Sequence, residues 1–157
     1  MSYDFEVQDS QSAVDVPSGW VEDVARGTLA AEGVVSAEIS IALVDDPRIH
    51  EVNRAHLEHD YPTDVISFLY DQCEVGEVDA SRRGSGKHLE GELVISGDTA
   101  AREARSYGWD GRDELALYVV HGLLHLCGYD DLTEDEQIEM RERERSILKN
   151  WGLTPHY

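Results

Sequence analysis

A long stretch that is apolar on most sides limits how this chain can fold. Residues 112–128, RDELALYVVHGLLHLCG, carry leucine, valine and alanine around most of a helical wheel and only two histidines near the end. A helix of this kind is stable only when other elements cover it, so the stretch predicts a buried helix. It is shorter than the roughly 20 apolar residues that a membrane-spanning helix needs.

The rest of the pattern predicts strands early in the chain and helices late. Alternation predicts strands, and 3.6-residue spacing with capping residues predicts helices. The expected strands are 3–8, 37–46, 64–70 and 92–96, and the expected helices are 17–33, 46–57, 97–108, 112–128 and 133–152. Polar, glycine-rich residues 71–91 are expected to form a loop or a loose hairpin. We therefore expect an α+β fold in a single domain, 1–157, with one mixed sheet of about four strands packed against helices.

Composition places limits on partners and location. No apolar run reaches the length of a membrane span, and the first residues lack the basic and apolar segments of a signal peptide, which predicts a cytoplasmic protein without a membrane partner. The net charge of −20 argues against nonspecific attraction to nucleic acid, although salt or a local basic patch can offset it. Cys73 and Cys127 lie in unlike contexts, so no disulfide is expected, and Cys127 reads as a core residue.

The end of the apolar helix carries a candidate metal site. His121 and His125 are four residues apart and therefore share one helix face, where both rings can reach one ion. Gly128 can end the helix in a left-handed conformation, and the turn can return Asp131 to the same point. Two histidines, one carboxylate and an open position suit catalytic zinc. The alternative is a pair of packed, hydrogen-bonded histidines, but burying them in an apolar helix without strong partners is costly.

A zinc peptidase is a weaker interpretation of the same residues. In H-E-x-x-H enzymes the glutamate after the first histidine is the general base, and Gly122 occupies that position here. A peptidase would need a base from elsewhere in the chain.

Four segments resemble the YbeY endoribonucleases, which are bacterial ribosomal RNA maturation factors. ELALYVVHGLLHLCGYDD, residues 114–131, is similar to the family signature H-G-x-L-H-L-x-G-Y-D-H. NRAHLEHDYPTDVISF (53–68) resembles a family segment that ends in P-T-D-V-L-S-F, GELVIS (91–96) resembles its G-D-I-x-I strand, and AAREARSYG (100–108) resembles the helix that follows. The resemblance implies a zincin-like fold and a zinc-dependent hydrolase that cuts single-stranded RNA in small-subunit 3′-end processing and ribosome quality control.

Two positions depart from the family pattern. The family's third histidine falls at Asp131, where an aspartate oxygen remains a competent zinc ligand. The family also carries an arginine that is thought to help catalysis, and its position here is Leu57, which cannot contact a phosphate. Arg54 is one helical turn away and is the candidate substitute; the alternative is an ordinary surface arginine.

Further residues have two interpretations each. Asp64 can orient a metal ligand or fix a turn, and His56 with His59 can form a second metal pair or lie exposed. The cations of the glycine-rich segment can contact RNA or line a solvated loop; they are Arg82, Arg83 and Lys87. Alternating charges in 140–149, MRERERSILK, predict a solvated helix face.

The sequence therefore predicts an endoribonuclease with one Zn²⁺ per chain, held by His121, His125 and Asp131, with single-stranded ribosomal RNA and the small ribosomal subunit as partners. One alternative is a ribosome-assembly or RNA-binding protein with weak or lost nuclease activity, which Leu57 and the net charge of −20 favour. The other is a different zinc hydrolase of the peptidase kind.

Overall fold

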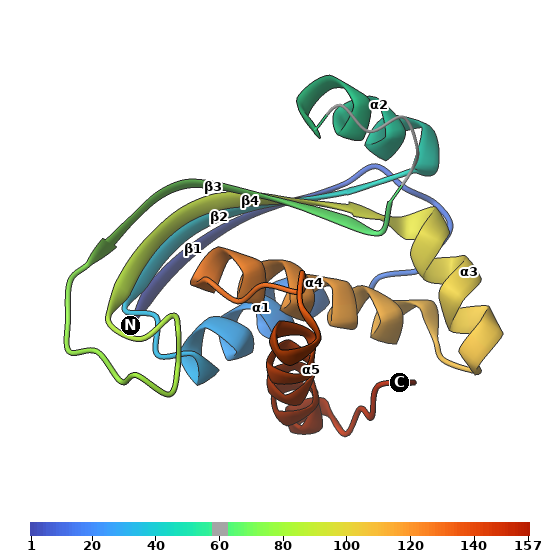
Figure 1. Ribbon diagram of the computed structural model, residues 1–157. Helices are drawn as coiled ribbons and strands as arrows, with labels where there is room; N and C mark the ends of the chain where they lie inside the picture. Colours follow the sequence, from blue (N-terminus) through green and yellow to red (C-terminus); the bar gives the residue numbers. More distant parts are fainter. Residues whose placement is uncertain (58–62) are drawn as a thin grey trace.

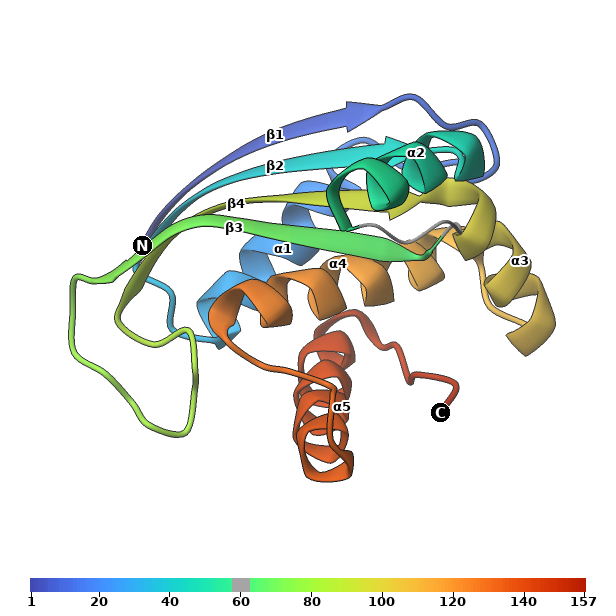
Figure 2. The same ribbon diagram turned by 45° about the horizontal axis from the view of Figure 1, so that its top comes forward.

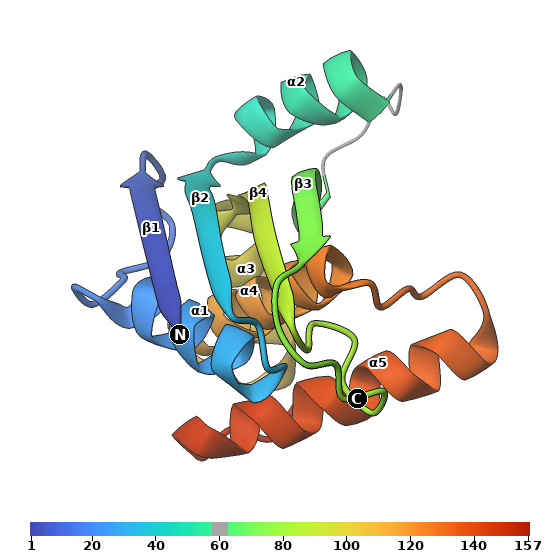
Figure 3. The same cartoon turned by 90° about the vertical axis from the view of Figure 1, so that its left-hand side faces the viewer.

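The sheet has four strands and is mixed, as the sequence predicts. The computed structural model describes residues 1–57, apart from the side chain of Leu57, and residues 63–157. Parallel pairs join the first, second and fourth strands, and the third strand pairs antiparallel at one edge (Figure 3). The spatial order is β1-β2-β4-β3, with strands β1 (Ser2–Asp9), β2 (Ser36–Val44), β3 (Val65–Glu74) and β4 (Lys87–Ser96).

Helices lie on both faces of this sheet, which gives the α+β architecture. The described helices are α1 (Trp20–Ala31), α2 (Asp46–Leu57), α3 (Gly97–Tyr107), α4 (Gly111–Cys127), α5 (Glu134–Leu148) and a short 3₁₀ turn, η1 (Lys149–Trp151). Figure 1 shows α1 and α4 under the concave face of the sheet and α2 on the opposite face. Within the described residues no helix is long and apolar enough to cross a membrane.

Helix α4 is the centre of the main core. Twelve of its residues are buried, and it contacts β3 and β4 above, α1 at its side and α5 below (Figure 2). Gly122 lets the helix approach the sheet closely, because a Cβ at this position would lie 2.8 Å from a methyl carbon of Leu93. Close packing at Gly122 therefore fixes the distance between the sheet and the face of α4 that carries the histidines.

The segment expected as a loop or loose hairpin is a hairpin with long arms. Strand β3 continues to Glu74 and β4 already begins at Lys87, so only the residues between them lie outside the strands. The residues of these arms satisfy their backbone groups in the antiparallel ladder. The added β3 residues, 71–74, are polar or exposed, and the added β4 residues, 87–91, are buried or half-buried but include only one large apolar side chain, so no apolar alternation marks either arm. One register shift, between Leu69 and Asp71, interrupts the ladder.

The charged stretch 140–149 is only partly solvated, which corrects the sequence prediction. The predicted capping box of Thr133 and Glu136 does open α5. Further along, however, Glu144 is buried together with Met140, and Arg143 reaches the fully buried carboxylate of Glu32, with 2.8 Å between Nε and Oε2. Two of the charges in this alternating run therefore belong to the interior.

The pair between Arg143 and Glu32 predicts a large change in stability. Replacing Arg143 with methionine leaves the Glu32 carboxylate buried without its cation, so the free energy of unfolding should fall by about 3 kcal/mol. Urea denaturation measures this change. The control is Arg48→Met, which removes an exposed pair with Glu51 and should cost less than about 1 kcal/mol. Equal losses in the two variants would show that the buried pair does not stabilise the fold.

Candidate metal centre

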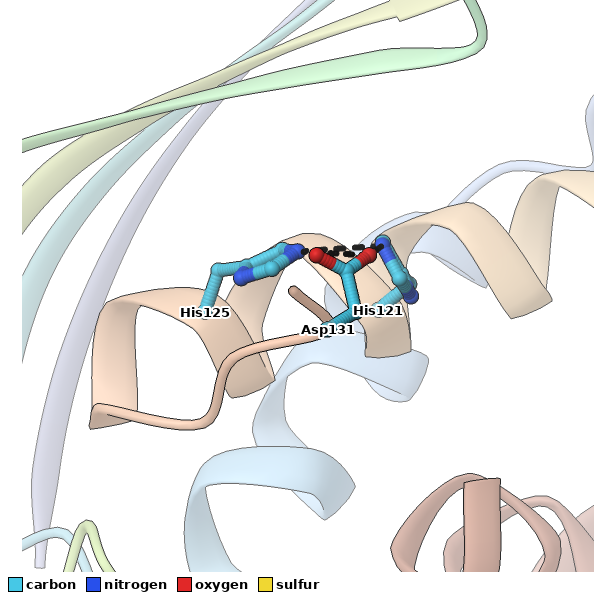
Figure 4. Close-up of side chains that lie close together, drawn as sticks. All are labelled: His121, His125 and Asp131. Carbon is cyan, nitrogen blue, oxygen red and sulfur yellow. Dashed lines mark hydrogen bonds and ion pairs between the residues drawn. The ribbon is translucent and has the colours of Figure 1, made fainter. Parts of the chain in front are cut away.

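Three side chains converge at the end of α4, as the sequence predicts. The Nε2 atoms of His121 and His125 are 3.1 Å apart. Oδ2 of Asp131 lies 3.5 Å from Nε2 of His121 and 3.6 Å from Nε2 of His125. Figure 4 shows the two rings and the carboxylate directed toward one point. Among the described residues these three form the one cluster of histidine, cysteine and acidic side chains suited to a metal ion.

The separations match those of ligands around one ion. Atoms bound at about 2.0–2.1 Å to a tetrahedral zinc lie about 3.3–3.4 Å from one another. The three distances between donor atoms fall around this value, and nitrogen and carboxylate oxygen are both suitable donors. The residues present therefore fit a metal ion, which His121, His125 and Asp131 would hold.

The loop after α4 brings Asp131 back to the helix. Gly128 ends α4 with a φ of 116°, a left-handed conformation that favours glycine. The Tyr129 backbone N–H donates to the carbonyl of Leu124, and the Tyr129 ring is buried. This anchored turn reverses the chain, so that Asp131 faces His121 and His125.

Each histidine has a second polar neighbour on the side away from the cluster. Nδ1 of His125 is 3.1 Å from the carbonyl oxygen of Tyr129. Nδ1 of His121 is 3.5 Å from Oε2 of Glu144, a residue that is 3% exposed. Such contacts hold a ligating imidazole in the tautomer that presents its other nitrogen to an ion. The sequence interpretation missed Glu144, since its only local signal was the charged run of α5.

These carboxylates also affect the protonation of His121. Burial lowers the pKa of His121, but the carboxylates of Glu144, Asp64 and Asp131 outweigh burial, and the pKa is raised overall. In the absence of an ion, the cluster therefore favours a proton on His121.

Two clefts meet at the cluster. The larger, of about 560 Å³, contains His121 and Asp131 and extends between α3, α4 and α5. The smaller, of about 420 Å³, lies between β3 and the end of α4 and contains both histidines. Asp64 lines both clefts. Its Oδ1 also accepts a hydrogen bond from the Val65 backbone N–H, so the turn-fixing interpretation of Asp64 holds alongside its place beside the cluster.

Other candidates from the sequence lie elsewhere. Arg54 is exposed on α2, across the sheet from the cluster, and does not line either cleft. His56 packs edge-on against Phe68, with 5.7 Å between ring centroids, while His59 lies outside the described residues. The side chain of Leu57 is also outside the described part.

The basic residues of the hairpin mainly hold the fold. Arg83 pairs with Glu139 at 3.1 Å and lies over the ring of Tyr129, and Nζ of Lys87 donates to the carbonyl of Cys127 at 2.9 Å. Arg82 is exposed. Cys127 is buried and both cysteines are free, which confirms Cys127 as a core residue. The hairpin is thus tied to the turn that carries Asp131.

The site combines two histidines, one turn apart on a buried helix, with a carboxylate that returns to them where two clefts meet. This combination defines the class of protein as a metal-dependent hydrolase. Residues 4–152 match the family described as Endoribonuclease YbeY. The chain belongs to this family of metalloenzymes, which hydrolyse RNA phosphodiester bonds.

Individual relatives agree with this assignment. The chain is 38% identical to Endoribonuclease YbeY of Bacillus licheniformis over 85% of both chains. It is 40% identical to Endoribonuclease YbeY of Bacillus mycoides over 86% of this chain and 84% of the relative. The solution structure of TM1509 from Thermotoga maritima matches 97% of this chain and 94% of its own with a TM-score of 0.56 and 19% identity, which supports the fold.

The contact between Glu144 and His121 predicts a measurable titration. In metal-free protein, His121 should titrate above the ordinary histidine pKa of 6.5, and Glu144→Gln should lower that pKa because the imidazolium loses its nearest buried carboxylate. NMR of the ring protons follows both. Glu142→Gln, an exposed neighbour on α5, is the matched control and should leave the pKa unchanged. A His121 pKa at or below 6.5 in the native protein would contradict this electrostatic description.

Proposed function

We propose that this chain is a zinc-dependent endoribonuclease specific for single-stranded RNA. It would hold one Zn²⁺ with His121, His125 and Asp131 in a single zincin-like domain spanning residues 1–157. Its substrate would be ribosomal RNA of the small subunit, in 3′-end maturation and ribosome quality control in the cytoplasm. The observation that carries the proposal is the triangle of donor atoms with edges of 3.1, 3.5 and 3.6 Å, open to two clefts in a chain of the YbeY family.

The chain's own residues would divide the work of cleavage. Zinc, when bound, supplies Lewis acidity that stabilises the charge developing on a phosphoryl oxygen. His121 and His125 are kept in position by Glu144 and the carbonyl of Tyr129. Asp64 lines both clefts beside the cluster, so its carboxylate is the group best located to accept a proton from an attacking water.

The mechanism also needs a cationic side chain that contacts the phosphate. The family position of the arginine is Leu57, and Arg54 is the substitute suggested by the sequence. Arg54 is exposed on α2 and lines neither cleft, which argues against Arg54 as the residue that contacts the phosphate. Arg102 and Arg141 line the larger cleft together with His121, so cations reach this cleft from α3 and α5.

A second candidate function is ribosome assembly or RNA binding with weak or lost nuclease activity. Leu57 and the net charge of −20 favour it, since both reduce stabilisation of a phosphate. A peptidase is disfavoured. Position 122 lacks the glutamate, and a side chain there would have to displace that of Leu93. Glu144 contacts Nδ1 of His121 on the side away from the donor cluster, so it does not replace that glutamate.

Metal content is the first test of the site. Purified, untagged protein should contain about one zinc per chain, and His121→Ala or His125→Ala should abolish it, because each change removes one of three ligands. Elemental analysis gives the stoichiometry. His56→Ala, on exposed α2, is the control and should keep the metal. Native protein that contains no transition metal and takes up none would refute the metal site.

Position 131 tests the third ligand. Asp131→His should keep zinc, whereas Asp131→Ala should weaken binding by more than the roughly 10- to 100-fold that loss of an outer hydrogen-bond partner costs. Competition with a fluorescent chelator measures the affinity. An alanine variant that binds as tightly as the native protein would transfer the role to another residue, with Asp130 the first to examine.

RNA cleavage tests the reaction. Metal-loaded protein should cut a single-stranded RNA that carries the small-subunit 3′ end, and a chelator should abolish the cleavage. Leu57→Arg should raise the rate on the order of 100-fold at unchanged zinc content, since it restores a stabiliser of the phosphate. Arg54→Ala should lower the rate only if Arg54 is the substitute.

The same assay separates the alternatives. If neither the native protein nor Leu57→Arg shows chelator-sensitive cleavage, the nuclease proposal is wrong and the assembly-factor candidate remains. Both proteins should be loaded with zinc and compared at low salt, where contacts between cations and phosphates are strongest.

A further inference from the structure

Three rings and the guanidinium of Arg141 form a continuous row that runs from the far end of the larger cleft to the surface beside it. Tyr107 and His156 stack face to face, with 3.8 Å between ring centroids and 4° between their planes. The ring of Tyr157 follows His156, at 6.2 Å between centroids. The guanidinium of Arg141 lies 5.0 Å from the centroid of Tyr157. We call Tyr107, His156 and Tyr157 the aromatic row.

Contacts of His156 with Glu114 and Trp109 hold the aromatic row in place. Nε2 of His156 is 3.0 Å from Oε2 of Glu114, a carboxylate that is 2% exposed, and Trp109 packs edge-on against the same ring. His156 is therefore fixed between α3 and α4. Tyr107, in contrast, is 51% exposed although one face of its ring is covered by His156. The row thus presents an ordered aromatic surface to solvent without having to reorganise.

The aromatic row is continuous with the candidate metal centre. His156, Tyr157 and Arg141 line the same cleft of about 560 Å³ as His121 and Asp131, and Tyr107 lies outside this lining, stacked on His156. Among the described residues no carboxylate forms an ion pair with Arg141, so its guanidinium remains available to an anion. A strand whose phosphate lies at the cluster can therefore extend along the cleft past Arg141 to the aromatic row.

The charge of the protein makes stacking a suitable means of holding RNA. At a net charge of −20, long-range attraction to phosphate is weak. Stacking of bases on aromatic rings does not depend on net charge and accepts any base, because every base has a π-face. A nuclease with few free cations can gain affinity in this way.

We propose that this end of the cleft, together with the exposed ring of Tyr107 that stacks on His156 just outside the cleft lining, is a nucleotide-binding subsite for single-stranded RNA, in which Tyr107 stacks a base and Arg141 contacts a neighbouring phosphate. The proposal rests on the proposed function for its ligand, and it adds where the strand is held outside the reacting bond. It also accounts for a preference for single strands, since a paired base cannot present its face to Tyr107.

Binding of a labelled single-stranded RNA of about ten nucleotides tests this subsite. The protein is used as purified, anisotropy is measured at several salt concentrations, and a gel after each titration shows that the RNA is intact. Tyr107→Ala should weaken binding roughly tenfold without changing the salt dependence, and Tyr107→Phe should bind within about twofold of native. Arg141→Gln should weaken binding and reduce the slope of log affinity against log salt by about one.

Matched controls come from the opposite face of the sheet. Tyr70 on β3 is 66% exposed and stacks on Phe68. Unlike His156, on which Tyr107 stacks, Phe68 lines neither cleft, so Tyr70→Ala removes a comparable ring away from the cleft and should not affect binding. Arg48→Gln changes the net charge as Arg141→Gln does, at an exposed position of α2. Circular dichroism checks that each variant is folded.

The outcomes separate this subsite from the nuclease proposal. If native protein binds the RNA and Tyr107→Ala binds no more weakly than Tyr70→Ala, the subsite is wrong while chelator-sensitive cleavage still stands. Equal loss in Tyr107→Phe and Tyr107→Ala would also overturn stacking, because the ring is retained in the first. Native protein that binds no RNA at low salt would overturn the subsite and the RNA substrate together.

Discussion

Burial of α4 on every side is the constraint on which the structure depends. The helix is too apolar to lie at a surface, so the sheet, α1, α3 and α5 must all pack around it. Beyond the first turn of α4 the histidines are the exception, because each remains 26% exposed where the two clefts meet. Close packing at Gly122 then holds both rings at a set distance from β3. The arrangement of donor atoms is thus a consequence of how the core is built.

Helix α5 joins the stability of the fold to the site. Neighbouring residues on this helix contact different parts of the interior. Arg143 pairs with the buried Glu32, which directly follows α1, and Glu144 contacts His121. A shift of α5 that broke the first contact would also remove the second. The helix therefore links the packing beside α1 to the orientation of His121, and the same helix supplies Arg141 to the wall of the larger cleft.

The fold and the donor cluster could be predicted from sequence because their signals are local. Histidine spacing, the glycine that ends α4 and the returning aspartate lie within eleven residues, and strand alternation marked the four-stranded sheet. Glu144 could not be predicted in this way, since its partner is 23 residues away and only tertiary packing joins them. The hairpin arms were not predicted for a related reason. Their pairing is satisfied by backbone groups, and their mostly polar side chains carry no periodic apolar signal.

The register shift in β3 divides that strand between two environments. Before the shift, Ser67 and Leu69 line the smaller cleft; beyond it, the strand projects into solvent with Asp71 and Glu74 exposed. An irregularity of this kind bends and twists an edge strand, and acidic side chains on it repel an identical edge. The β3 edge, one of the two edges of the sheet, is therefore a poor template for pairing with a second copy. Self-association through β-strand addition is discouraged at the one wall of the cleft where it would obstruct access to the histidines.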